Sequence, residues 1–437
     1  MRYLAALVTL PILALCAASP TSPAARASAS LHPAHGSMRA AQHGSLSTLH
    51  AADERCVAGS GDAARLVARA LEATGMGRLD GRVVRLQAAE AEANDFQSDR
   101  PYPPFFSTMT AYETWLDPAT GIERSRSRLT YVGQGPMAPM EIVSSAGATY
   151  AARDTSLMPV PTLHGRTVRS RPLHAWSMLR DWADAADVRV AGSCVYRDFP
   201  RTVIARGRDA GEERLYLDPE SGLPVKLERR ESHYLWGDVR VAYLYANWME
   251  TDGALFPMTT FRLVDGATVV TRTVGDLALL PRDSAPRLSL PADAPRMVAA
   301  ADLFVQAMPT DTVRVGDAAF LLVNRAYTSA VVLARDTVWV LDATQGVERA
   351  RQDSAWVGRL FPGKHPVAVV VTDLAWPHVA GVRYWVGTGA TVVSHASSEP
   401  FLRQVVERRW TLEPDLLERN RATARFRFRA VSDSLAL

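Results

Sequence analysis

The fold of the last third of the chain is decided by residues 367–381, which read Val-Ala-Val-Val-Val-Thr-Asp-Leu-Ala-Trp-Pro-His-Val-Ala-Gly. Its first five residues are all apolar and predict a strand that is buried on both faces, as in a layered α/β domain. The loop behind that strand contains Asp373 and His378, whose side chains can bind a metal ion or carry a proton. A second apolar segment, residues 389–395, ends in another such side chain, His395.

The residues around this stretch predict a domain in which strands precede helices. The apolar spacing of residues 347–360 predicts a helix, and so do Phe401, Leu402, Val405 and Val406 behind Ser398 and Pro400. Four short strands are expected before the first helix, at residues 313–315, 319–323, 329–333 and 337–341.

This order of elements resembles the metallo-β-lactamase fold family over roughly residues 311–410. In that family a buried strand ends in a loop of the form T-H-x-H-x-D-H-x-x-G, and a second strand ends in another histidine. Residues 341–344, Leu-Asp-Ala-Thr, resemble the turn that precedes the family's first helix. The resemblance implies a partial α/β domain of the αββα type over residues 311–437, with a hydrolase-like site.

The metal ligands of the family are only partly present. Asp373 stands where the first histidine is expected, Ala375 replaces the second histidine, and Pro377 replaces the aspartate of the loop. His378 and His395 occupy the two remaining histidine positions.

The second half of the family's fold, with its last ligands, is missing. Asp415 and Asp433 follow His395, but no further histidine does. A catalytic zinc ion needs about three protein donors and an open position for water. We therefore expect a degraded site that holds no metal, and the alternative is one weakly held zinc ion between Asp373, His378 and His395.

Half of such a fold would leave one apolar sheet face open to water, which soluble proteins avoid. The face needs a cover, from the N-terminal domain, from a second copy in a homodimer, or from the C-terminal tail. Residues 424–430 alternate apolar side chains with arginines, as a half-buried strand does.

Residues 56–290 predict a different architecture. A helix is expected between the N-cap Asp62 and Gly75, and a second one near residues 173–185. Most of the remainder alternates apolar and polar residues between turn signals such as Asp117-Pro118 and Asp265-Gly266. The chain is therefore expected to be an α+β multidomain protein that begins with a curved antiparallel β half-barrel carrying helices.

Two phrases in this region resemble the LolA/LolB-like superfamily of exported carrier domains. They are residues 216–225, Tyr-Leu-Asp-Pro-Glu-Ser-Gly-Leu-Pro-Val, and residues 245–257, with Asp252-Gly253 and Phe256-Pro257. The resemblance implies a curved sheet around an apolar cavity, which that family uses for lipid chains. The alternative is a scaffold sheet with a filled core.

The N-terminus is typical of an exported protein. Residues 1–19 are expected to be a signal peptide, and residues 20–55, rich in Ala, Ser, Pro and His, a disordered tether. Cys16 closes an imperfect lipobox, so a lipid anchor is the alternative to its removal with the signal. In an oxidising compartment Cys56 and Cys194 are expected to form a disulfide, or else to stay as buried thiols.

Composition excludes some functions. The net charge is +3 and no basic cluster suggests a nucleic-acid surface, while no second apolar stretch is long enough to span a membrane. A Pro-rich linker is expected at residues 291–310. Three functions remain: an exported hydrolase-like protein with little or no activity, a non-enzymatic periplasmic or envelope carrier of an apolar ligand, or an active hydrolase with an unusual single-metal site.

Overall fold

The computed structural model describes residues 55–93, 107–131, 135–153, 156–160, 168–294, 296–297, 310–324, 327–364 and 367–432. The expected signal peptide, Cys16, nearly all of the expected tether, most of the expected linker and Asp433 lie outside these residues. No helix within the described ranges combines the length and the apolar character needed to cross a membrane.

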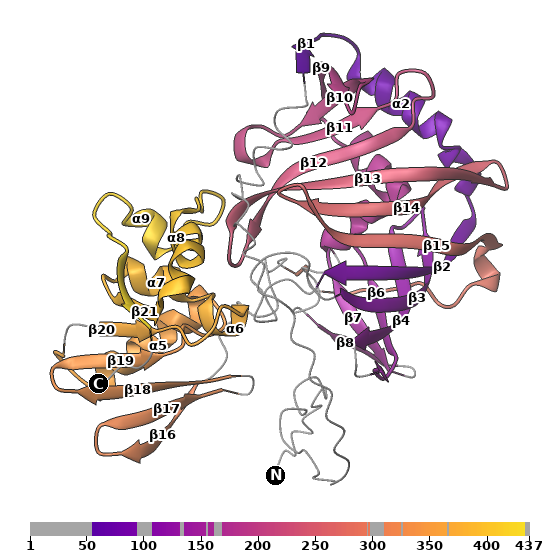
Figure 1. Ribbon diagram of the computed structural model, residues 1–437. Helices are drawn as coiled ribbons and strands as arrows, with labels where there is room; N and C mark the ends of the chain where they lie inside the picture. The colour runs from indigo at the N-terminus through magenta and orange to yellow at the C-terminus, as the bar shows by residue number, and fades with distance from the viewer. Residues whose placement is uncertain are drawn as a thin grey trace, which may run out of the picture. The chain divides into compact units, whose positions relative to one another are not determined.

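The first part of the described chain is one large antiparallel sheet (Figure 1). Its order among the described residues is β1-β9-β10-β11-β12-β13-β14-β15-β2-β3-β4-β6-β7-β8, with β5 beside β4. The strands are β1 (Arg55–Ala58), β2 (Arg82–Ala93), β3 (Ser107–Asp117), β4 (Ile122–Tyr131), β5 (Gly135–Pro136), β6 (Met140–Ser144), β7 (Thr149–Arg153), β8 (Ser156–Pro159), β9 (Arg189–Tyr196), β10 (Phe199–Arg206), β11 (Glu213–Leu217), β12 (Pro224–His233), β13 (Gly237–Thr251), β14 (Ala254–Val264) and β15 (Ala267–Pro281).

Short polar turns join neighbouring strands, as the sequence predicts. Between β11 and β12, the Asp218 carboxylate accepts hydrogen bonds from the backbone N–H groups of Glu220 and Ser221. Gly222 then adopts φ +78°, a left-handed conformation that glycine adopts without steric cost. Local side-chain bonding of this kind therefore fixes where each strand reverses.

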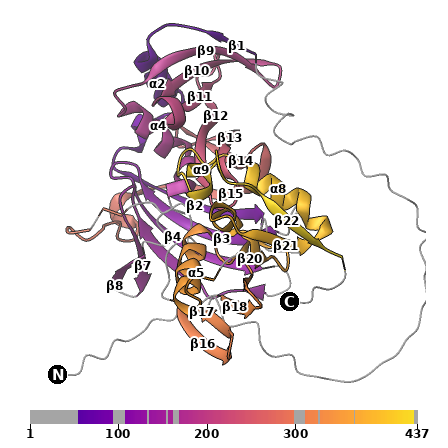
Figure 2. The same ribbon diagram turned by 90° about the vertical axis from the view of Figure 1, so that its left-hand side faces the viewer.

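Two helices and short 3-10 turns cover one face of this sheet. They are α2 (Ala63–Ala73), η1 (Met76–Leu79), η2 (Arg171–Leu173) and α4 (Ala175–Ala183), and α2 lies beside α4 (Figure 2). Asp62 caps α2 by accepting a hydrogen bond from the Arg65 N–H at 3.0 Å, as predicted. Val67, Leu179 and Trp182 of these helices pack on Leu215 and Tyr243 of the sheet. We call this side the covered face.

The second sheet is mixed. Within the described residues its order is β16-β17-β18-β19-β20-β21-β22, antiparallel up to β19 and parallel from β19 onward. The strands are β16 (Asp311–Gly316), β17 (Ala319–Val323), β18 (Thr328–Ala334), β19 (Thr337–Leu341), β20 (Val367–Val370), β21 (Thr391–His395) and β22 (Arg427–Val431). The helices are α5 (Val347–Leu360), α6 (Trp376–Val379), α7 (Val382–Gly387), α8 (Glu399–Glu407) and α9 (Leu416–Arg419).

Helices α5, α6, α7 and α8 pack on one face of the mixed sheet, with Val340, Val369 and Val392 beneath them. The loop between β12 and β13 reaches the same helical layer, because Leu235 is fully buried there and Trp236 stacks edge-on against Phe401. On the other face Trp339, Ala368 and Val393 form a small apolar cluster of their own.

The idea that the C-terminal tail covers this other face is wrong. Residues 427–431 form β22 and extend the sheet beside β21 instead of lying across it. The alternation of the tail explains this outcome, since Phe428 packs on the helical side while Arg427 and Arg429 stay exposed.

Candidate functional site

The carboxyl ends of β19, β20 and β21 place the side chains expected at the degraded site along one edge of the mixed sheet. Asp342 follows β19, Asp373 lies behind β20, His378 belongs to α6, and His395 ends β21. Parallel strands all end at the same edge, and ligands in open α/β sheets bind there.

His378 lies between two carboxylates. Its Nδ1 is 2.8 Å from Asp342 Oδ2, and its Nε2 is 3.5 Å from Asp373 Oδ2. The hydrogen bond to Asp342 raises the pKa of His378, and burial opposes it. The pKa of Asp342 is lowered by its bonds to His378 and Thr372 in spite of burial, so the arrangement favours an imidazolium beside a carboxylate.

The potential metal ligands at this edge do not form a zinc site in their present positions. Asp373 accepts a hydrogen bond from the Ala375 N–H, and His395 Nδ1 bonds to the hydroxyl and the backbone N–H of Ser397. Across the described ranges no three His, Cys, Asp or Glu side chains are grouped so that they could hold a metal ion.

Asp342 is the residue of this edge that sequence reasoning missed. The sequence places it only in a turn. In the structure its carboxylate accepts hydrogen bonds from the Thr372 N–H and the Thr372 hydroxyl, and it also binds His378. Its φ of +68° is uncommon for a residue other than glycine. An aspartate directly after a strand is a signal that could have identified it.

The covered face of the large sheet is apolar beneath the helices. Leu86, Leu116 and Phe256 form one cluster with Trp176 of α4, and the cluster around Trp182 lies under α2 and α4. Most of these side chains are almost fully buried. This part of the face therefore resembles the filled core that the sequence left as an alternative.

Farther along the covered face the side chains become polar. Arg272 is paired in the sheet with Glu90 and Thr260, and its Nη2 lies 3.0 Å from Glu90 Oε2. Its Nη1 lies 3.2 Å from His174 Nε2. Burial, followed by the charge of Arg272, holds the pKa of His174 well below its usual value, so this imidazole is neutral and accepts from Arg272.

Several buried polar atoms beside this row have no hydrogen-bond partner among the described residues. They are Thr260 Oγ1, Trp176 Nε1 and Arg262 Nε. The Arg272 guanidinium lies 5.0 Å from the centre of the Tyr112 ring. Burial raises the pKa of Tyr112, so its hydroxyl stays protonated and can donate. Unpaired buried donors are costly and are rarely retained without a role.

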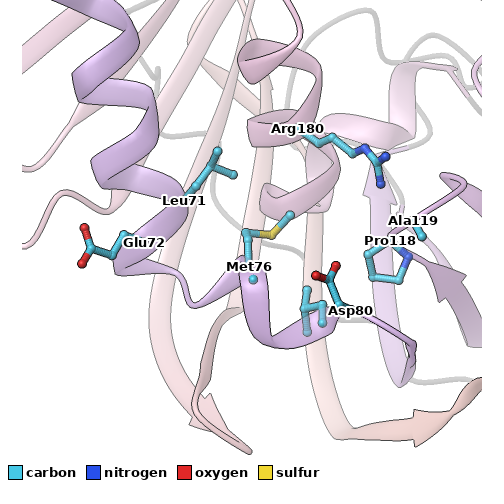
Figure 3. A pocket seen from close by; sticks show the side chains of 9 residues that line it. Leu71, Glu72, Met76, Asp80, Pro118, Ala119 and Arg180 are labelled. Atoms are coloured by element: carbon cyan, nitrogen blue, oxygen red, sulfur yellow. The ribbon is translucent and has the colours of Figure 1, made fainter.

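A pocket of about 460 Å³ lies where α2 and η1 meet α4 and the β3–β4 turn (Figure 3). Leu71, Met76 and Leu79 supply its apolar wall, and these side chains also pack on the two apolar clusters of the covered face. In Figure 3 Met76 stands in the middle of the labelled side chains, while Glu72 points away from it.

A disulfide closes the far edge of this sheet. Cys56 of β1 and Cys194 of β9 are direct partners in the antiparallel register, with their Cα atoms 4.0 Å apart. The bond joins residues separated by 138 positions in the chain, so it links β1, which precedes α2, covalently to β9.

No protein-family model matches this chain, and no curated protein does. Among solved structures, the LolA superfamily protein NE2245 of Nitrosomonas europaea is similar over 52% of this chain and 99% of its own, at 12% identity and a TM-score of 0.35. LprF of Mycobacterium bovis is similar over 54% of this chain and 100% of its own, at 11% identity and a TM-score of 0.20.

The DIM-1 metallo-β-lactamase is similar over 22% of this chain at 13% identity and a TM-score of 0.20, and the chain spans 48% of its length. The similarity to the LolA superfamily protein and to LprF thus extends over about half of the chain, and the similarity to the lactamase is weak and partial. At such identities and scores these similarities decide nothing about function, which we argue from the side chains.

Proposed function

We propose that this chain is a non-enzymatic binding or carrier protein that takes an apolar, lipid-like ligand into its large antiparallel sheet. The observation that carries the proposal is the pocket beside α2, whose wall of Leu71, Met76 and Leu79 continues into the apolar clusters of the covered face. A concave, mostly apolar pocket with a few polar groups is the usual form of a small-molecule site.

The helical cover is a small part of the chain. Helices α2 and α4 and their short 3-10 turns pack on the apolar clusters, and Val188 and Trp236 add to one of them. Gly75, between α2 and η1, has φ +68°, and its Cβ would lie 2.5 Å from the Gly253 carbonyl oxygen if it had one. This glycine therefore allows η1 to lie close to β14.

The finer assignments belong to the same proposal. They are a curved half-barrel over residues 56–290, a linker at 291–310, a partial metallo-β-lactamase-like domain at 311–437, and an exported protein of the periplasm or cell envelope. The signal at residues 1–19, with or without a lipid on Cys16, supports export, and so does the disulfide, because such bonds persist in oxidising compartments.

The proposal is tested by filling the pocket. In the full-length protein, Met76→Trp should lower the affinity for a dansyl-labelled fatty acid about tenfold, since the larger ring occupies the space of the ligand. Met249→Trp is the matched control, because Met249 is 57% exposed on β13 and does not line the pocket.

Fluorescence titration measures both affinities, and mass spectrometry of an organic extract of the purified protein identifies any apolar ligand that remains bound. Equal binding by both variants, or no binding by the wild type, would exclude a carrier site in this pocket.

The second candidate function is a weak hydrolase at the edge of the mixed sheet. The observation in its favour is the position of His378 between Asp342 and Asp373, where an imidazolium could donate a proton to a leaving group. Hydrolysis of a chromogenic ester that His378→Ala abolishes would favour it. A protein that does not hydrolyse such esters, or hydrolysis that persists in His378→Ala, would end it.

A further inference from the structure

The mixed sheet has a second pocket, at the edge opposite to His378. It has a volume of about 570 Å³ and lies at the amino ends of the parallel strands, where Val367 begins β20 and Arg427 begins β22. The end of α5 and the end of α7 form its other walls. No residue of the degraded site lines it.

The lining of this pocket combines an apolar wall with positive charge. Phe361 and Trp385 are 7% and 1% exposed, and Lys364 and Arg427 supply two cations. No Asp or Glu is among the lining residues. Among the described carboxylates Lys364 pairs only with Asp336, at 3.9 Å, and both of these side chains are largely exposed, so the pairing is weak.

Hydrogen-bond donors in the lining also remain available. Trp385 Nε1 is buried and has no partner among the described residues. Arg427 donates through Nη1 to the Gly389 carbonyl oxygen at 3.5 Å, and no ion pair is seen between it and a described carboxylate. The lining therefore supplies positive charge and hydrogen-bond donors, and it contains no negatively charged acceptor.

Gly358 is an exposed glycine in the lining of this pocket. It lies inside α5, where glycine costs about 1 kcal/mol relative to alanine. A Cβ at this position would meet no atom within 4 Å, and its φ does not require glycine. No described contact explains the missing side chain, but it keeps the pocket open, because Gly358 is one of its lining residues.

We infer that this pocket binds a small organic carboxylate with an aromatic or aliphatic body. The carboxylate would meet Lys364 and Arg427, and the body would rest on Phe361 and Trp385. The inference is independent of the proposed carrier function, because the two pockets share no residue.

The test is calorimetric titration of the full-length protein with 3-phenylpropionate, and with 3-phenylpropanol as the uncharged analogue. The acid should bind at least tenfold more tightly than the alcohol. Gly358→Trp should abolish binding by filling the pocket, and Lys364→Gln/Arg427→Gln should weaken binding of the acid at least tenfold.

Two controls separate the outcomes. Gly211→Trp alters another glycine whose Cβ would meet open space, outside both pockets, and should leave the affinity unchanged. Met76→Trp should also leave it unchanged, so failure of the carrier proposal does not affect this result. Equal binding of acid and alcohol, unchanged binding by Gly358→Trp, or absence of binding would overturn the inference. If Gly358→Trp does not fold, the Lys364/Arg427 double variant decides alone.

Discussion

The two sheets bury charged groups in different ways. In the mixed sheet's helical layer, Arg383 is fully buried and its guanidinium is saturated by Asp415 and by the carbonyl oxygens of Val405, Val406 and Arg408. On the covered face of the large sheet, Arg272 also has partners, but the hydroxyl of its cross-strand neighbour Thr260 has none among the described residues. A saturated buried charge is typical of structural support, whereas unpaired donors are typical of a surface that awaits a ligand.

The largest expected effect is on Arg383. Replacing it with Met leaves the Asp415 carboxylate buried without its cation, which costs about 3–5 kcal/mol of the free energy of unfolding. Urea unfolding monitored by tryptophan fluorescence measures this loss. Arg409→Met is the control, since the Arg409 side chain is mostly exposed and its loss should cost less than about 1 kcal/mol. A small loss for Arg383→Met would show that this charge is not structural.

The next effect concerns pH. Burial and the charges of Arg262, Arg169 and Arg408 lower the pKa of His233 to about 3, although the nearby Glu231 opposes them. Because the folded-state value lies below the unfolded value of about 6.5, stability is complete above pH 6.5 and is lost as the pH falls. At pH 5 the loss should be about 2 kcal/mol.

His233→Asn isolates this contribution. An asparagine oxygen can still accept the hydrogen bonds that His233 Nδ1 receives from the Leu235 and Trp236 N–H groups, and it does not titrate. The variant should therefore lose less stability between pH 7 and pH 5 than the wild type does. His378→Asn should change the slope in the opposite direction, because the pKa of His378 is raised and its protonation stabilises the folded state. Equal slopes for all three proteins would contradict these assignments.

The smallest effect compares two buried hydroxyls. The Tyr245 hydroxyl donates to the Pro172 carbonyl oxygen at 2.7 Å, so Tyr245→Phe should cost about 1 kcal/mol. Thr260→Val replaces a hydroxyl that has no partner among the described residues, and it should be neutral or slightly stabilising. Thermal or urea unfolding measures both. A cost of about 1 kcal/mol at both positions would mean that the Thr260 hydroxyl is satisfied, and the contrast between the sheets would weaken.

The sequence predicted the positions of individual helices and strands better than the contacts between them. Apolar periodicity is a local signal, and it located α5 at Val347–Leu360 and β19 at Thr337–Leu341. It did not predict α7, because that helix is only six residues long and has Arg383 among its buried positions. Arg383 can be buried only because it pairs with Asp415, which is 32 residues away. No local sequence pattern around either residue predicts that pairing.

The candidate site was only partly predictable for the same reason. His378 and Asp373 could be found because they share one loop, and the structure brings them to 3.5 Å. Asp342, which fixes the other side of the imidazole, comes from a strand 36 residues earlier. The second pocket could not be foreseen, since its lining joins residues from Ser354 to Arg427 that meet only when the parallel strands align.

The alternation of apolar side chains and arginines along β22 affects how this sheet can associate with other chains. β22 is the last strand of the mixed sheet within the described residues, so its outer backbone groups are free to pair with a strand of another molecule. Arg427 and Arg429 are exposed on it, and β16 at the opposite edge carries Arg314. A partner strand at β22 would have to bring its own side chains against these charges, so this border resists the edge-to-edge growth that leads to aggregation. The β16 border resists it less, because Val313 and Val315 are exposed on either side of Arg314.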